Sequence, residues 1–151
     1  MQILPGDLDD PLIAALLGVH LARALAVTPR ASVHALDISA LKAPGIAFWA
    51  AWDGAALLGV GALQHLSAKH GEVKSMHTAE HARRRGVASA MLHHIIREAR
   101  AKGHSRLSLE TGAMPYFEPA RAFYRGLGFS DCGPFGIYAP DPNSVFMTLA
   151  I

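Results

Sequence analysis

Apolar residues recur at helical spacing near the start of the chain. The helix is expected to begin at Asp9-Asp10-Pro11, because acidic residues and a first-turn proline favour a helix N-terminus. Thr28-Pro29 should end it, since the residue before a proline avoids helical geometry. The apolar stripe between these signals comprises Leu12, Ile13, Leu16, Leu17, Leu21 and Leu25.

Two further helices are predicted in the second half of the chain. The clearer one covers Val87–Lys102, where basic residues gather near the end and Gly103 suits the position after the last turn. A shorter one covers Pro119–Leu127 and is closed by Gly128. The longer helix has an apolar stripe of Val87, Ala88, Met91, Leu92, Ile95 and Ala99.

Between the first two helices, the pattern predicts three antiparallel strands in a meander. Apolar runs over Gly45–Trp52 and Ala55–Leu66 flank Asp53-Gly54, a pair typical of a two-residue type I′ hairpin turn. Ala68–Gly71 should form the next turn, and residues 72–78 then alternate along a third strand. Strict alternation would place Glu72, Lys74 and Met76 on one face of that strand.

The remaining segments complete an α+β pattern. Arg106–Glu110 and Val145–Ile151 are expected to be strands, Gln2–Leu4 could be a short first strand, and Ala31–Ala43 is interpreted as a loop with a short helix. A helix joins the strands at 72–78 and 106–110, so these two should be parallel. The predicted fold is therefore a mixed, mostly antiparallel sheet flanked by helices.

Composition narrows the class of protein. A chain of 151 residues, 51% of them hydrophobic, is expected to form a single domain over residues 1–151. No apolar run reaches the ~20 residues that a membrane-spanning helix needs, and the N-terminus lacks the pattern of a signal peptide, so we expect a cytoplasmic protein. Its lone cysteine, Cys132, can form no internal disulfide. The exposed edge of the terminal strand is consistent with a homodimer.

The charge and the histidines also exclude some functions. A net charge of +2 gives little reason to expect a nucleic-acid partner. The 9 histidines show no zinc-binding spacing, so no metal is expected. The densest positive cluster is Arg83-Arg84-Arg85, and a protein that binds nucleic acid through this cluster is one alternative function.

The segment Arg83–Ser89 predicts an anion site. It lies between a strand and the start of the long helix, where unpaired backbone N–H groups and a partial positive charge suit a phosphate or diphosphate. Gly86 lets an anion approach the backbone closely, and Ala88 and Ser89 are small. The arginine side chains add charge-assisted donors.

Two motifs in this order resemble the GNAT (GCN5-related N-acetyltransferase) superfamily. Arg83-x-x-Gly86-x-Ala88 is similar to its Q/R-x-x-G-x-G/A signature, and Ala120-x-x-x-Tyr124-x-x-x-Gly128-Phe129 is similar to its second pattern. The resemblance covers roughly Gly45 to the C-terminus. The segments Leu109–Tyr124 and Asp141–Met147 are similar to a subgroup of small bacterial GNAT proteins whose acceptors are largely unassigned.

The resemblance implies where a CoA thioester would bind. The two parallel strands would splay apart and admit acetyl-CoA as co-substrate, with the backbone of Met76, His77 and Thr78 along its pantetheine arm. The diphosphate would lie against the segment Arg83–Ser89. Its residues are Arg83, Arg84, Arg85, Gly86, Val87, Ala88 and Ser89. Phe123 and Tyr124 would face the sulfur end. Tyr124 matches the family tyrosine that protonates the leaving thiolate.

A base that deprotonates the attacking amine is harder to assign. Glu72 is favoured, because it lies eleven positions before Arg83, where histone-type members carry a catalytic glutamate. An equally good alternative is a surface glutamate at the start of an exposed strand, paired with Lys74. Glu110 and Glu118 are lesser candidates, either for catalysis or for binding a cationic acceptor.

The acceptor side departs from the family pattern. Phe117 stands where many members have asparagine. The connection 111–115, together with Phe135, Tyr138 and the loop 141–144, could line the acceptor pocket.

The resemblance therefore implies transfer of an acetyl group from acetyl-CoA to a primary amine of a small molecule or a protein. The alternative on the same fold is a non-catalytic CoA-binding regulatory module.

Overall fold

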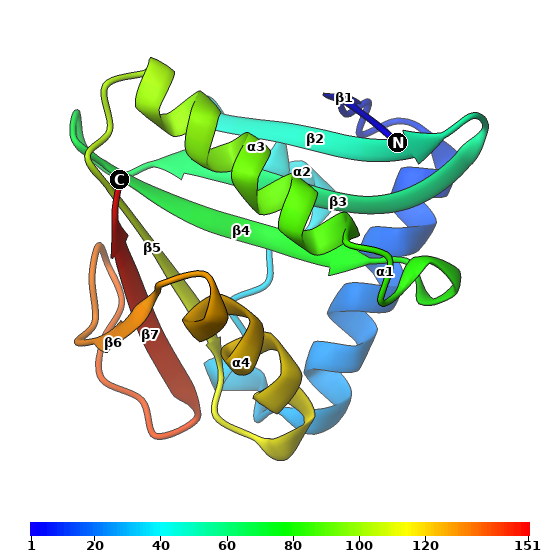
Figure 1. Ribbon diagram of the computed structural model, residues 1–151. Helices are drawn as coiled ribbons and strands as arrows, with labels where there is room; N and C mark the ends of the chain where they lie inside the picture. Colours follow the sequence, from blue (N-terminus) through cyan, green and yellow to red (C-terminus); the bar gives the residue numbers. More distant parts are fainter.

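A computed structural model describes residues 1–151 and contains one seven-stranded sheet (Figure 1). The strand order is β1-β2-β3-β4-β5-β7-β6, and the β4–β5 pair is parallel whereas the other pairs are antiparallel. This confirms the predicted α+β class. The strands are β1 (Gln2–Pro5), β2 (Ile46–Asp53), β3 (Ala56–His65), β4 (His70–Thr78), β5 (Arg106–Gly112), β6 (Ser130–Cys132) and β7 (Ser144–Ala150).

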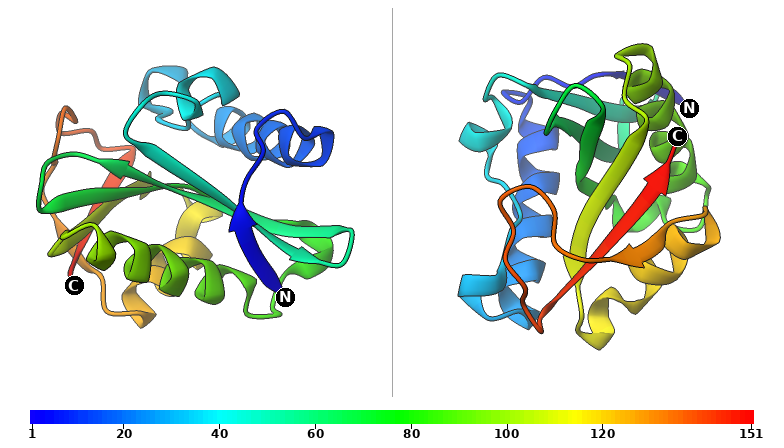
Figure 2. Two further views of the ribbon diagram at one scale, coloured as in Figure 1. Left: turned by 90° about the horizontal axis from the view of Figure 1, so that it is seen from above. Right: turned by 90° about the vertical axis from the view of Figure 1, so that its left-hand side faces the viewer.

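Helices cover both faces of the sheet (Figure 2). On one face lie α1 (Pro11–Val27) and α2 (Ile38–Leu41), and on the other lie α3 (Val87–Ala101) and α4 (Glu118–Gly126). Each face has its own apolar core. The α3 side includes Met91, Leu92 and Ile95, whereas the α1 side includes Ile13 and Leu17.

The ends of α1 follow the sequence signals. The Asp10 carboxylate accepts a hydrogen bond from the Leu12 amide at 2.8 Å, and Pro11 occupies the first turn. Thr28 caps the other end in an extended conformation, as its position before Pro29 requires.

Both predicted turns of the meander are shifted. The hairpin loop is Gly54-Ala55 rather than Asp53-Gly54, because Asp53 still pairs with Ala56. Of these two loop residues only Gly54 has a positive φ, at 56°, so the turn is not the predicted type I′. The next turn ends at Lys69, since His70 and Gly71 already belong to β4.

A bulge in β4 overturns the predicted alternation. Ser75 has a φ of 54°. Val60 pairs with His77 and Ala62 pairs with Lys74, so β4 advances three residues where β3 advances two. The extra residue moves Met76 to the α3 side, where it packs against the core of that face. Met76 therefore does not share a face with Glu72 and Lys74.

The sequence pattern missed β6, a strand of three residues that pairs with β7 at the edge of the sheet. The segment interpreted as a loop with a short helix contains α2 and a 3-10 turn over Arg30–Ser32. None of the helices has the length and apolarity that crossing a bilayer requires.

Candidate functional site

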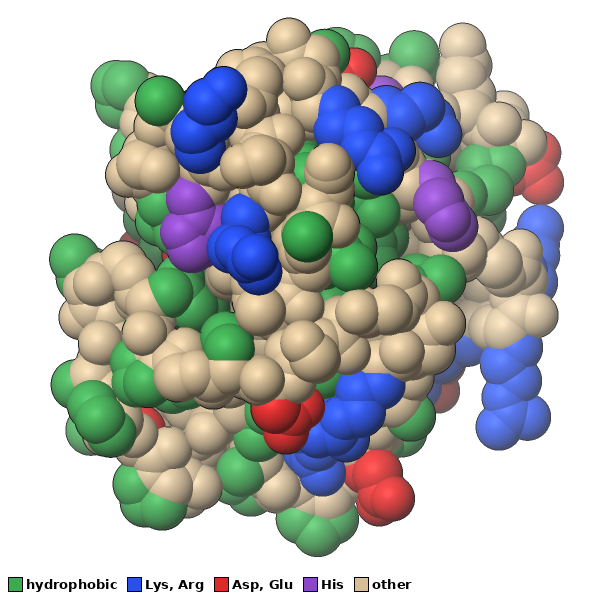
Figure 3. All heavy atoms as spheres, turned by 60° about the vertical axis from the view of Figure 1, so that its left-hand side comes forward, with side chains coloured by type: hydrophobic (Ala, Val, Ile, Leu, Met, Phe, Trp, Pro, Cys, Tyr) green, Lys and Arg blue, Asp and Glu red, His purple; other side chains and the backbone are tan.

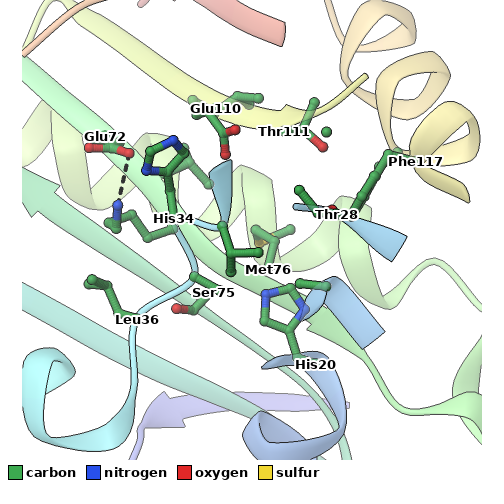
Figure 4. Close-up of a pocket in the computed structure, with 18 of the residues that line it drawn as sticks. His20, Thr28, His34, Leu36, Glu72, Ser75, Met76, Glu110, Thr111 and Phe117 are labelled. Carbon is green, nitrogen blue, oxygen red and sulfur yellow. Dashed lines mark hydrogen bonds and ion pairs between the residues drawn. The ribbon is translucent and has the colours of Figure 1, made fainter. Parts of the chain in front are cut away.

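β4 and β5 separate soon after they meet. They pair only where His70–Glu72 faces Arg106–Ser108, although β4 continues beside β3 to Thr78 and β5 continues beside β7 to Gly112. The backbone of β4 beyond Glu72 therefore has no strand partner on its β5 side. A cavity of about 150 Å³ opens between the diverging strands, bounded also by α1, the segment 32–36, α4 and Tyr138 (Figure 4).

The N-terminus of α3 presents a row of free amides. The first backbone bond of the helix runs from the Ala90 amide to the Gly86 carbonyl, whereas the amides of Arg84–Ser89 have no acceptor in the protein. Gly86 has a φ of 77° and Arg84 one of 61°, which is what turns the chain into the helix. A Cβ on Gly86 would meet no atom within 4 Å, so the backbone is open there.

The three arginines beside these amides are exposed. Arg85 lies 3.8 Å from the Asp53 carboxylate, but Arg83 and Arg84 form no ion pair. On the face drawn in Figure 3, lysine and arginine side chains occur in small groups separated by apolar, acidic and neutral surface. That face shows no continuous basic surface.

The end of β4 borders both the gap and α1. His77 lies against His20 of α1, with ring centroids 4.9 Å apart. Burial, followed by the charges of His20, Arg23 and Arg83, lowers the pKa of His77 to about 4. Both Met76 and His20 line the cavity.

α4 holds Tyr124 at the cavity. Arg121 ties the helix to the end of β5, because its Nη1 donates to the carbonyls of Gly112 and Met114 at 2.6 and 3.0 Å. The Tyr124 ring is buried against Phe123 and Phe129. Tyr124 lines the cavity, and its hydroxyl has no hydrogen-bond partner in the protein. Burial raises the pKa of this hydroxyl.

Glu72 is buried, contrary to the interpretation as an exposed glutamate, although its pairing with Lys74 is present. Its side chain is only 4% exposed, and Oε2 accepts hydrogen bonds from Lys74 Nζ at 3.0 Å and from the Tyr138 hydroxyl at 2.5 Å. Burial, together with the charge and hydrogen bond of Glu72, raises the pKa of Tyr138. Oε1 of Glu72 has no hydrogen-bond partner in the protein.

Of the two lesser carboxylate candidates, only Glu110 lies at the cavity. Glu110 lines the cavity, where its Oε2 accepts a hydrogen bond from the Ser144 hydroxyl at 2.7 Å. Glu118 is exposed at the start of α4 and does not line the cavity.

Some of the residues predicted on the acceptor side line the cavity, and others do not. Tyr138, Thr111 and Phe117 line the cavity, and the Phe117 ring packs so closely on Gly112 that a Cβ there would clash at 2.1 Å. Phe135 instead packs against Tyr138 and the apolar surface around it.

Sequence reasoning missed the contribution of the N-terminal third. His20, Thr28 and His34 line the cavity, yet α1 and the segment after it carry no recognisable motif. The packing of α1 on β3 and β4 brings His20 and Thr28 there, and His34 packs against Tyr138. Across the whole chain, no three side chains able to bind a metal ion come together.

Comparison with known proteins gives consistent matches. The model of the acetyltransferase (GNAT) family matches residues 19–129. The chain is 49% identical over 148 residues to the uncharacterized N-acetyltransferase YsnE of Bacillus subtilis, covering 98% of each chain. It is 42% identical over 120 residues to the IAA acetyltransferase of Azospirillum brasilense, covering 79% of this chain and 77% of that one.

Solved structures share the fold. A Klebsiella pneumoniae protein assigned as an acyl-CoA N-acyltransferase superimposes with a TM-score of 0.82 at 25% identity, over 99% of this chain and 96% of that one. An aminoglycoside 6'-N-acetyltransferase complexed with coenzyme A gives a TM-score of 0.73 at 15% identity, over 99% and 97% of the two chains.

Proposed function

The chain belongs to the acetyltransferase (GNAT) family, and from this premise we propose that it transfers an acetyl group from acetyl-CoA to a primary amine of a small molecule or protein. The observation that carries the proposal is the row of free amides over Arg84–Ser89 beside the gap between β4 and β5. A helix N-terminus with unpaired N–H groups is a ready-made site for a diphosphate.

The cofactor would run from this site into the gap. Its diphosphate would accept hydrogen bonds from the amides of Arg84–Ser89, with the exposed Arg83 and Arg84 guanidinium groups nearby. The pantetheine arm would lie along the unpaired edge of β4 at Met76, His77 and Thr78, as an added strand would. Its sulfur end would then reach the cavity beside Phe123 and Tyr124.

In the transfer, the acceptor nitrogen loses two protons and the leaving thiolate gains one. The acceptor ammonium loses a proton, for which we propose Oε1 of Glu72 as the acceptor, and the neutral amine attacks the thioester carbonyl. A backbone amide near Met76 would stabilise the oxyanion of the tetrahedral intermediate. Collapse breaks the C–S bond, and the thiolate takes the proton of the Tyr124 hydroxyl. The nitrogen gives its second proton to the resulting Tyr124 phenolate, which restores the tyrosine and leaves the amide product and CoA.

Release of free CoA thiol from acetyl-CoA in the presence of a panel of primary amines tests this function. We expect thiol release that depends on the added amine, and mass spectrometry should find the acceptor heavier by one acetyl group. Tight binding of acetyl-CoA without turnover of any amine would contradict the proposal and favour a CoA-binding regulatory module.

The role of Glu72 has its own test. Glu72→Gln should lower kcat/KM and remove the acidic limb of its pH profile, because the variant has no carboxylate to accept the proton. An unchanged pH profile would exclude Glu72 as the base. A cytoplasmic location, a homodimer and the lack of a nucleic-acid partner stay predictions.

A further inference from the structure

The charges that line the cavity do not balance. Lys74 is its only lysine or arginine, and its ammonium group is already bound to Glu72 and to the Tyr138 hydroxyl, each at 3.0 Å. Glu110 is the second carboxylate, and no cation forms an ion pair with it. The cavity therefore has one carboxylate more than it has lysine and arginine side chains, and His34 is the one histidine whose charge acts on Glu110.

Glu110 has an oxygen free for a ligand. Ser144 donates to Oε2, and Oε1 has no hydrogen-bond partner in the protein. In Figure 4 the Glu110 carboxylate comes from β5 and points into the space that His34 and Met76 also face, whereas Glu72 lies to one side. There Glu72 pairs with Lys74 at 3.0 Å.

Without a ligand, the surroundings of Glu110 disfavour the ionised form of its carboxyl group. Burial is the largest cause that raises its pKa, and the nearby Glu72 carboxylate adds to it. The Ser144 hydrogen bond, His34 and Lys74 act in the opposite direction but do not offset it. A bound cation would therefore stabilise the ionised Glu110 carboxylate, because it supplies the opposite charge that the protein does not provide.

We propose that Glu110 binds the ammonium group of the acceptor, and that the cavity thereby selects small amines with one positive charge and no carboxylate. The inference rests on the proposed function and names its acceptor class. A carboxylate on the acceptor would be repelled by Glu110 and would find Lys74 already paired. At about 150 Å³ the cavity is smaller than sites for drug-sized ligands, which are about 300–1,000 Å³, and this favours a small acceptor.

Three acceptors that share a propyl chain test the selection. Butylamine carries one positive charge, norvaline adds a carboxylate beside the amine, and butyric hydrazide is a neutral nucleophile at pH 7. We expect the wild-type protein to have a kcat/KM for butylamine at least about tenfold higher than for norvaline, as an unfavourable buried charge implies.

Glu110→Gln removes the charge and keeps the shape. It should raise the KM for butylamine by about 10- to 100-fold, the range expected for loss of a charged hydrogen bond, and leave the KM for the hydrazide within about threefold. Glu118→Gln makes the same chemical change outside the cavity and should alter neither value. A butylamine KM unchanged in Glu110→Gln, or an equal rise for the hydrazide, would overturn the inference.

Binding can be judged without turnover. Calorimetric titration of butylamine into the CoA-saturated protein should give a Kd that rises in Glu110→Gln and not in Glu118→Gln. If wild type acetylates no amine, the proposed function fails, while this titration still decides whether Glu110 binds the ammonium group. Equal Kd values in the wild type and Glu110→Gln would reject the ammonium site.

Discussion

At the scale of single residues, the Tyr124 hydroxyl differs from most buried polar groups. It makes no hydrogen bond to the protein. The side-chain polar atoms that are fully buried without a partner are His94 Nε2 and His104 Nδ1, so the Tyr124 hydroxyl keeps some exposure. Its aromatic ring, by contrast, is packed on Phe123 and Phe129. The packing fixes the ring while the hydroxyl stays free to act on a substrate.

Tyr124→Phe should therefore separate catalysis from stability. We expect kcat for acetyl transfer to fall roughly 10²-fold, the usual contribution of a general acid. The KM for the amine and the melting temperature should hardly change, because no protein hydrogen bond is lost. Steady-state kinetics and a thermal melt measure both quantities. Wild-type kcat in this variant would show that the thiolate does not depend on Tyr124.

The buried pair of Lys74 and Glu72 should matter for folding. Lys74→Met leaves the Glu72 carboxylate buried without its cation, and should lower the free energy of unfolding by about 3 kcal/mol. Lys42→Met is the matched control, because Lys42 pairs with Asp9 at 2.7 Å but both side chains are largely exposed. The control should cost under about 1 kcal/mol. Urea unfolding of both variants makes the comparison, and equal losses would contradict it.

Motif residues could be located from the sequence, whereas their surroundings could not. The spacing of Gly86 and Ala88 within one motif identified the start of α3, and Tyr124 stood out in the second motif. The burial of Glu72 was not predictable, because its partner Tyr138 lies 66 positions away and reaches it only through the loop before β7.

At the scale of elements, α3 was predicted to within one residue at its C-terminal end. Its apolar stripe repeats at helical spacing and glycines stand at both ends, so local sequence alone defines it. The bulge in β4 has no such signal, because Ser75 adopts a positive φ that sequence patterns assign to glycine or asparagine. That one residue reversed the face of Met76.

The two glycines at the ends of α3 allow a matched experiment. Gly86 and Gly103 have φ values of 77° and 88°, and a Cβ on either would meet no protein atom. Alanine at either position should cost about 1 kcal/mol of stability, the usual penalty for a left-handed non-glycine residue. Only Gly86→Ala should also weaken CoA binding, because its methyl group would stand where the diphosphate approaches the free amides. Calorimetric titration of CoA into both variants tests this, and equal Kd values would contradict it.

At the scale of the whole molecule, the cavity depends on contacts between distant segments. β4, β5 and α4 bring the motif residues, while α1 and the loop before β7 close the outer side (Figures 1 and 4). The order of strands follows from the hairpin and crossover signals. Tyr138 of the loop before β7 was expected at the acceptor pocket. The contribution of α1 could not be predicted, because α1 has no motif and reaches the cavity only by packing.

Several histidines, spread over α1, β3, β4 and α3, should make the fold sensitive to acid. Burial is the largest cause that lowers the pKa of each of five side chains, and the value for His77 is about 4. The other four are His20, His65, His70 and His94. His65 also lies 2.5 Å from His104 and 3.4 Å from Lys102, both of which disfavour a further positive charge.

A lowered histidine pKa means that the unfolded chain binds protons more readily than the folded one. Stability should therefore be fully present above about pH 6.5, the unfolded histidine pKa, and should fall as the pH decreases toward 4. Glu110, whose pKa is raised, acts in the opposite direction but is a single group. Urea unfolding at pH 7.5, 6 and 5 at constant ionic strength should show decreasing midpoints. A midpoint that stays constant or rises would be inconsistent with buried neutral histidines.

The most direct measurement is the response of the backbone amides themselves to CoA. In a ¹H–¹⁵N NMR titration, we expect saturable shifts concentrated at the amides of Arg84–Ser89 and at Met76–Thr78, with little change at Gly103 on the far end of α3. Saturable binding that left the amides of Arg84–Ser89 unmoved, or no binding at all, would contradict it.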